Sequence, residues 1–107
     1  AMVPRERFLD RTFTASERAY CLARVHPEQS FAARFCAKEA AMKCLGTGWT
    51  AGVRFVDVEV VRGERGEVSM QLHGEAARIA GDLGIRRWHV SLTHTDTTAT
   101  AFVVAEA

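Results

Sequence analysis

The stretch from Arg34 to Gly48, RFCAKEAAMKCLGTG, places charged side chains on a short helix that ends in a glycine turn. Glu39 and Lys43 are four residues apart, so they share one helix face, and Phe35 adds an apolar group to that face. A carboxylate beside an ammonium group suits a metal-and-phosphate site, where the carboxylate holds a divalent cation and the lysine meets the phosphate. The alternative is an ordinary surface ion pair, which the spacing alone favours.

A second motif, WHVSLTHT, covers residues 88–95. Apolar and polar residues alternate in it, which predicts a strand with one apolar face. The strand runs into His94, Thr95 and Asp96, a group of polar side chains where the chain turns. Functional groups often gather at such positions, because a rigid scaffold aims the loop. The alternative is an exposed turn whose side chains cap their own backbone.

The remaining sequence predicts short helices and strands in alternation. A capping box at Thr14 and Glu17 predicts a helix that runs to about His26, and Pro27 suits the first turn of the next helix, which stops at Gly46. Later segments predict a strand with Val56, Val58 and Val60, its partner with Val68, Met70 and Leu72, a helix from Glu75 to about Leu83, and strands near 88–93 and 99–105. This order indicates an α+β fold with a largely antiparallel sheet.

Size and composition predict an ordinary globular protein. A length of 107 residues allows one domain, and 48% hydrophobic with 25% charged residues is typical of soluble folds. A net charge of +1 gives no argument for binding nucleic acid or membranes, and no apolar run approaches the length of a membrane span. The three cysteines lack metal-ligand spacing, so we interpret them as reduced thiols and expect a cytoplasmic protein.

The two motifs together resemble the holo-acyl-carrier-protein synthase family of 4′-phosphopantetheinyl transferases. The resemblance includes a G-T-G turn at residues 46–48, the strand motif WHVSLTHT, and RFLDRTFTASE at residues 7–17, which is similar to the family's R-F-x-x-R-x-x-T-x-x-E stretch. The helix matches the family pattern F-x-x-K-E-A-x-x-K at Phe35, Lys38, Glu39, Ala40 and Lys43. The likeness covers nearly the whole chain and implies a single 4′-phosphopantetheinyl transferase domain over residues 1–107, mostly antiparallel sheet packed with helices.

The resemblance implies a reaction and its participants. The donor is coenzyme A, the acceptor is a serine hydroxyl of an acyl carrier protein, and 3′,5′-ADP leaves after transfer of the phosphopantetheine arm. Glu39 would hold Mg²⁺, Lys43 would offset phosphate charge, and Asp96 would act as a base or as a helper of His94. The catalytic residues implied are Glu39, Lys43, His94 and Asp96.

Binding roles are implied in the same way. The coenzyme A contacts implied are Arg34, Lys38, Lys43, Gly46, Thr47, Gly48, His94 and Thr95, with Lys38 divided evenly between substrate contact and ion pairing. Arg5 and Arg7 would meet the acidic surface of the carrier protein, because scattered cations suit electrostatic steering. Solvated surface arginines are the alternative for either one alone.

One feature of the family is missing from this sequence. Family members usually begin with a strand of the type G-x-D-I-x-x-I-x-R, whose aspartate is a metal ligand, and here the chain reaches Arg7-Phe8 without it. Two further hypotheses are therefore open: a non-catalytic homologue that binds coenzyme A or a carrier protein, and a transferase domain from a larger fatty-acid or polyketide synthase. Family members with one copy of the domain work as trimers, and their double-length relatives contain two copies. Because this chain has the length of a single copy, the resemblance implies a homotrimer, with the Val-rich strand and the Trp49 region as expected contacts.

Overall fold

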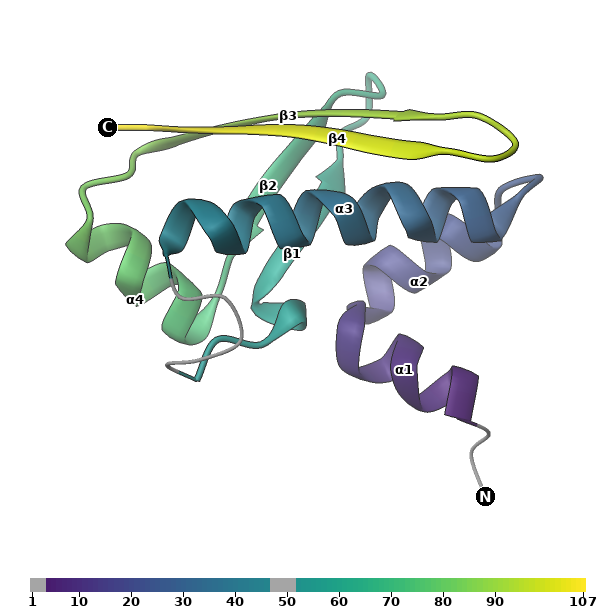
Figure 1. Cartoon of the computed structure of the whole chain (residues 1–107), viewed down its shortest axis with the longest axis horizontal. Coiled ribbons are helices and arrows are strands. Elements are labelled where there is room, and N and C mark those ends of the chain that lie inside the picture. Colours follow the sequence, from purple (N-terminus) through teal and green to yellow (C-terminus); the bar gives the residue numbers. More distant parts are fainter. Residues whose placement is uncertain (1–3, 47–51) are drawn as a thin grey trace.

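The computed structural model describes residues 4–46 and 52–107. The long helix α3 crosses the molecule, the hairpin of β3 and β4 runs along it, α1 and α2 lie beside its N-terminal half, and α4 lies near its C-terminal end (Figure 1). The fold is α+β with antiparallel strand pairs, as predicted. The elements are α1 (Pro4–Thr12), α2 (Ala15–Leu22), α3 (Pro27–Leu45), the 3₁₀ turn η1 (Phe55–Asp57), β1 (Val58–Arg62), β2 (Val68–Leu72), α4 (Gly74–Asp82), β3 (Arg87–His94) and β4 (Ala99–Glu106).

The long helix α3 begins and ends where the sequence predicts. Pro27 occupies its first turn, and Gly46 closes it in the left-handed conformation with φ of 75°, which glycine adopts without a steric penalty. Its buried face includes Ala37, Ala41 and Met42, which pack against β1, β2 and α4 in the main core. Met42 therefore helps to anchor α3 to the core.

Helix α2 begins with the predicted capping box. The Thr14 hydroxyl accepts from the Glu17 amide at 3.2 Å, and the Glu17 carboxylate accepts from the Thr14 amide at 2.8 Å. The helix ends at Leu22, so the expectation that it reaches His26 was wrong. A proline disfavours helical geometry in the residue before it, and His26 has φ of −124° and ψ of 82°.

The first strand starts later than its valines suggest. Val56 belongs to the 3₁₀ turn η1, so its assignment to a strand was wrong. The reason is Asp57, whose carboxylate accepts from the Arg54 amide at 3.2 Å and from its guanidinium at 2.8 Å, which holds the chain in a tight turn. Strands β2, β3 and β4 agree with the predicted segments, whereas helix α1 had not been predicted.

A buried ion pair connects α2, α3 and β1. The Lys38 ammonium lies 2.7 Å from a Glu17 oxygen, and both side chains are fully buried. Lys38 also donates to the carbonyl oxygens of Phe55 at 3.0 Å and Val58 at 2.7 Å. The second Glu17 oxygen accepts from the Val60 amide at 2.7 Å. Every polar atom of the pair therefore has a partner, which buried charges require.

The placement of apolar side chains changes the expectation about subunit contacts. Val58 and Val60 lie in the core of the chain, so these two side chains are not available for a subunit contact, and Trp49 lies outside the described residues. Instead, Phe102 and Val104 on β4 are 73% and 55% exposed.

Among residues 4–46 and 52–107, no helix has the length and apolar character to cross a membrane.

Candidate active site

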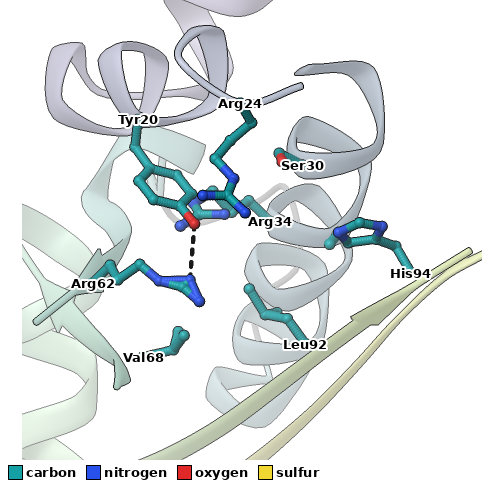
Figure 2. Close-up of a pocket in the computed structure, with 9 residues that line it drawn as sticks. Tyr20, Arg24, Ser30, Arg34, Arg62, Val68, Leu92 and His94 are labelled. Carbon is teal, nitrogen blue, oxygen red and sulfur yellow. Dashed lines mark hydrogen bonds between the residues drawn. The ribbon is translucent and has the colours of Figure 1, made fainter. Parts of the chain in front are cut away.

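A cavity of about 120 Å³ lies between α2, α3 and the strands β1 to β3. Figure 2 shows side chains from all of these elements pointing toward one space. The lining residues are Tyr20, Arg24, Ser30, Ala33, Arg34, Arg62, Val68, Leu92 and His94. Two of them, Arg34 and His94, were predicted from the sequence to contact the nucleotide.

The cavity is strongly basic. Arg24, Arg34 and Arg62 contribute three permanent positive charges, and no carboxylate occurs among its lining residues in the described chain. Arg34 is nearly fully buried, and its Nε has no hydrogen-bond partner among the described residues. A buried unpaired donor is costly unless a ligand or water satisfies it. The arrangement therefore favours a bound anion with several acceptor oxygens, such as a phosphate.

Glu39 and Lys43 are both exposed on α3, outside this cavity. Neither has a salt bridge in the part of the chain that the structure describes, and they do not pair with each other. The surface ion pair that spacing favoured is therefore not formed. The Glu39 carboxylate and the Lys43 ammonium are accessible to a ligand.

The turn after β3 divides the predicted His94 cluster. His94 lines the basic cavity, whereas Thr95 and Asp96 line a separate hollow of about 170 Å³ that also includes Glu28. The Thr95 hydroxyl accepts from the amides of Thr97 at 3.3 Å and Thr98 at 3.1 Å. This is the local backbone capping that was the alternative for this turn, and among the described residues the Thr95 hydroxyl donates no hydrogen bond.

Of the two predicted roles of Lys38, substrate contact and ion pairing, the structure shows ion pairing. Its three ammonium donors meet Glu17, Phe55 and Val58, and the side chain has no solvent exposure. Burial lowers the pKa of Lys38, and the Glu17 carboxylate opposes that shift. No donor is left for a substrate, so the predicted coenzyme A contact at Lys38 is corrected to an internal ion pair.

The other predicted residues are distributed around the molecule. Gly46 caps α3, and Arg7 is exposed on α1. Thr47, Gly48 and the Arg5 side chain lie outside the described residues. Within residues 4–46 and 52–107, no group of three or more histidine, cysteine, aspartate or glutamate side chains converges as a metal site.

Sequence reasoning missed Tyr20, Arg24 and Arg62 as lining residues. They come from α2, the segment after it and β1, and no local motif connects them. Cys21 lies beside Tyr20 in sequence, and burial raises the pKa of its thiol while the Arg34 guanidinium opposes the shift. A buried thiol with a raised pKa is a poor nucleophile, so Cys21 serves as a small apolar side chain.

Comparison with known proteins decides the family. The model of the 4′-phosphopantetheinyl transferase superfamily matches residues 2–102. The chain belongs to this superfamily. The transferase is 48% identical over 101 residues to the holo-[acyl-carrier-protein] synthase of Koribacter versatilis, covering 94% of this chain and 81% of the relative. It is also 38% identical over 105 residues to the fatty acid synthase subunit alpha of Candida albicans, covering 97% of this chain and 6% of that protein.

Solved structures agree with the transferase fold. The holo-[acyl-carrier-protein] synthase of Neisseria meningitidis superposes with a TM-score of 0.84 at 29% identity, covering 95% of this chain and 82% of that one. The Helicobacter pylori synthase, solved in complex with coenzyme A, superposes with a TM-score of 0.79 at 25% identity, covering 94% of this chain and 82% of that one. The resemblance predicted from the sequence is confirmed.

Proposed function

We propose that this transferase moves the 4′-phosphopantetheine arm of coenzyme A to a serine of an acyl carrier protein and releases 3′,5′-ADP. The observation that carries the proposal is the basic cavity, where three arginines and His94 meet and the lining residues of the described chain include no carboxylate. Coenzyme A presents a diphosphate and a further phosphate, and guanidinium groups recognise such dianions through several hydrogen bonds at once. The Helicobacter pylori synthase was solved with coenzyme A, which agrees with this donor.

The cavity would hold one phosphate of the donor. The buried Arg34 would gain acceptors for its unpartnered Nε, and His94 would contribute a ring nitrogen from the end of β3. Because these groups are held by α3 and β3, they would fix the donor before the serine attacks. Such positioning is a large part of catalysis in phosphoryl-type transfer.

Glu39 and Lys43 would act on the reacting diphosphate. The Glu39 oxygens are exposed and have no salt-bridge partner among the described residues, so they suit a hard cation such as Mg²⁺. When bound, Mg²⁺ would offset negative charge on the diphosphate. Lys43, one helical turn further along α3, would contact a phosphate oxygen, and Asp96 would be the base that accepts the serine proton.

The carrier protein would approach from the side of α1. Arg7 is exposed there, and with Arg5 it would steer the acidic surface of the carrier. We also propose a homotrimer, in which Phe102 and Val104 on the outer face of β4 are covered by a neighbouring subunit. Exposed apolar groups of this size on one strand suit such a contact.

A second candidate is a transferase domain that works inside a larger fatty acid synthase. The observation that favours it is the 38% identity to a segment that is only 6% of the Candida albicans subunit. Incubation with an excised apo-carrier domain and with a free apo-carrier protein would separate the two settings.

The central experiment is mass spectrometry of an apo-carrier protein incubated with the chain, coenzyme A and Mg²⁺. We expect the carrier to gain the mass of the phosphopantetheine arm. An unmodified carrier, with coenzyme A binding intact, would support the non-catalytic alternative instead.

Two variants test the assigned roles. Glu39→Gln and Lys43→Ala should each lower turnover or coenzyme A binding by about one to three orders of magnitude, because each removes a charge-stabilising group. Folding should be unchanged, because both side chains are exposed. Glu64→Gln is a matched control, since Glu64 is exposed in the turn after β1. Wild-type rates in both variants would refute the assignment.

A further inference from the structure

Tyr20, on α2, is the common neighbour of the three arginines in the cavity. The guanidinium carbon of Arg34 lies 4.1 Å from the centre of the Tyr20 ring, and those of Arg62 and Arg24 lie 5.2 Å and 5.5 Å from it. The Tyr20 hydroxyl also accepts a hydrogen bond of 2.8 Å from Nη1 of Arg62 (Figure 2). One aromatic side chain therefore contacts cations from α3, β1 and the segment after α2.

Three like charges around one cavity repel each other. A carboxylate would relieve this repulsion, but it would also repel an incoming anion, and the lining residues in the described chain include none. The face of an aromatic ring attracts a cation within about 6 Å without adding net charge. Tyr20 therefore stabilises the arginines and leaves the cavity positive.

Arg62 depends on this contact more than Arg34 does. Arg34 is nearly fully buried on α3, so packing restricts its side chain. Arg62 is exposed at the end of β1, where a long side chain would otherwise sample many rotamers. Its hydrogen bond to the Tyr20 hydroxyl directs the guanidinium toward the cavity.

We propose that Tyr20 is a positioning residue for donor binding, which holds Arg34 with its ring and Arg62 with its hydroxyl in the arrangement that receives a phosphate. This role rests on the proposed function of the cavity. Tyr20 would not touch the reacting atoms, because Glu39 and Lys43 lie outside the cavity lining. Its loss should therefore weaken binding of coenzyme A more than the rate of the chemical step.

Two substitutions separate the parts of the Tyr20 side chain. Tyr20→Phe keeps the ring and removes the acceptor for Arg62, and we expect the Kd and KM for coenzyme A to rise by about threefold to tenfold. Tyr20→Leu removes the ring face as well, and we expect a rise of about tenfold or more. In both variants kcat should stay within about twofold of wild type, since the lost contact is made equally in the ground state and the transition state.

A double-mutant cycle tests the contact between the hydroxyl and Arg62. Calorimetric titration with coenzyme A would compare Tyr20→Phe, Arg62→Gln and the double variant. We expect the double variant to bind like Arg62→Gln alone, because the hydroxyl then has no arginine to hold. Arg78→Gln is the matched control, since Arg78 is exposed on α4 and does not line the cavity.

The outcomes distinguish this inference from the proposed function. If Arg34→Gln leaves coenzyme A binding unchanged, the cavity is not the donor site and both proposals fail. If Arg34→Gln weakens binding while Tyr20→Phe does not, or if the cycle is additive, the positioning role of Tyr20 is wrong and the donor site stands. If Tyr20→Leu does not fold, the cycle with Tyr20→Phe still decides.

Discussion

Replacing Lys38 by methionine should destabilise the fold far more than the same replacement of a surface lysine would. Lys38 is fully buried against Glu17, so the substitution leaves a buried carboxylate without its counter-charge. Breaking a buried pair in this way costs about 3–5 kcal/mol. The carbonyl oxygens of Phe55 and Val58 lose their donor in the same step. Since a domain has only about 5–15 kcal/mol of stability, the variant should be marginal.

The measurement is urea unfolding followed by circular dichroism, with Lys43→Met as the matched control. Lys38 and Lys43 are the only lysines in the sequence, and both lie on α3. With an m-value of about 2 kcal/mol/M, Lys38→Met should lower the midpoint by about 2 M. Lys43→Met, at an exposed position, should change stability by no more than about 0.5 kcal/mol.

The double variant Glu17→Gln, Lys38→Met examines the cause. It removes the unpaired charge, so it should recover part of the loss, with a coupling of about 0.5–3 kcal/mol between the two sites. Equal stabilities for Lys38→Met and Lys43→Met would show that the buried pair does not matter as argued. A double variant no better than Lys38→Met would show that lost hydrogen bonds, rather than the stranded charge, dominate.

The remaining predictions concern assembly and pH. Light scattering should show a trimer, and Phe102→Ser with Val104→Ser should shift it toward monomer; a stable wild-type monomer at micromolar concentration would contradict this. Burial works to raise the pKa of Glu59, but hydrogen bonds from Thr14 and His73 outweigh it and the pKa lies below its usual value. Glu59 therefore stabilises the fold above the ordinary glutamate pKa of about 4.3, and this stability is lost as the pH falls through the lower folded pKa. Glu59→Gln should flatten the acid side of the stability profile, and an unchanged profile would refute this.

Local signals were enough to predict most elements of the fold. The capping box at Thr14 and the glycine at position 46 act within one turn of their own helices, so their effect is visible in the sequence. Val56 was misassigned because alternation does not reveal that Asp57 captures the Arg54 backbone and closes a 3₁₀ turn. Helix α1 was missed because its residues had been interpreted only as a motif.

The candidate site was only partly predictable. Arg34 and His94 were identified through motifs, and the structure brings them to one cavity. Tyr20 and Arg62 lie 42 residues apart, and only the packing of α2 against β1 makes them neighbours. The same applies to Lys38, since its burial depends on a carboxylate from another helix. Residue identity indicated the chemistry, whereas tertiary contacts decided which groups converge.

The ion pair of Glu17 and Lys38 also prevents a strand of another molecule from pairing with β1. The backbone N–H and C=O groups of Val58 and Val60 point away from β2. On that side of β1, the Lys38 ammonium donates to the Val58 carbonyl oxygen, and the Glu17 carboxylate accepts from the Val60 amide. If a parallel strand were added at this edge, the N–H of one of its residues would donate to the Val58 carbonyl, and the C=O of the same residue would accept from the Val60 amide. The Lys38 and Glu17 side chains thus occupy the hydrogen-bonding positions of a neighbouring strand. They satisfy the free edge of β1, which would otherwise be a template for intermolecular β-pairing. Variants that lose this pair should therefore aggregate through β1 even under conditions in which they still fold.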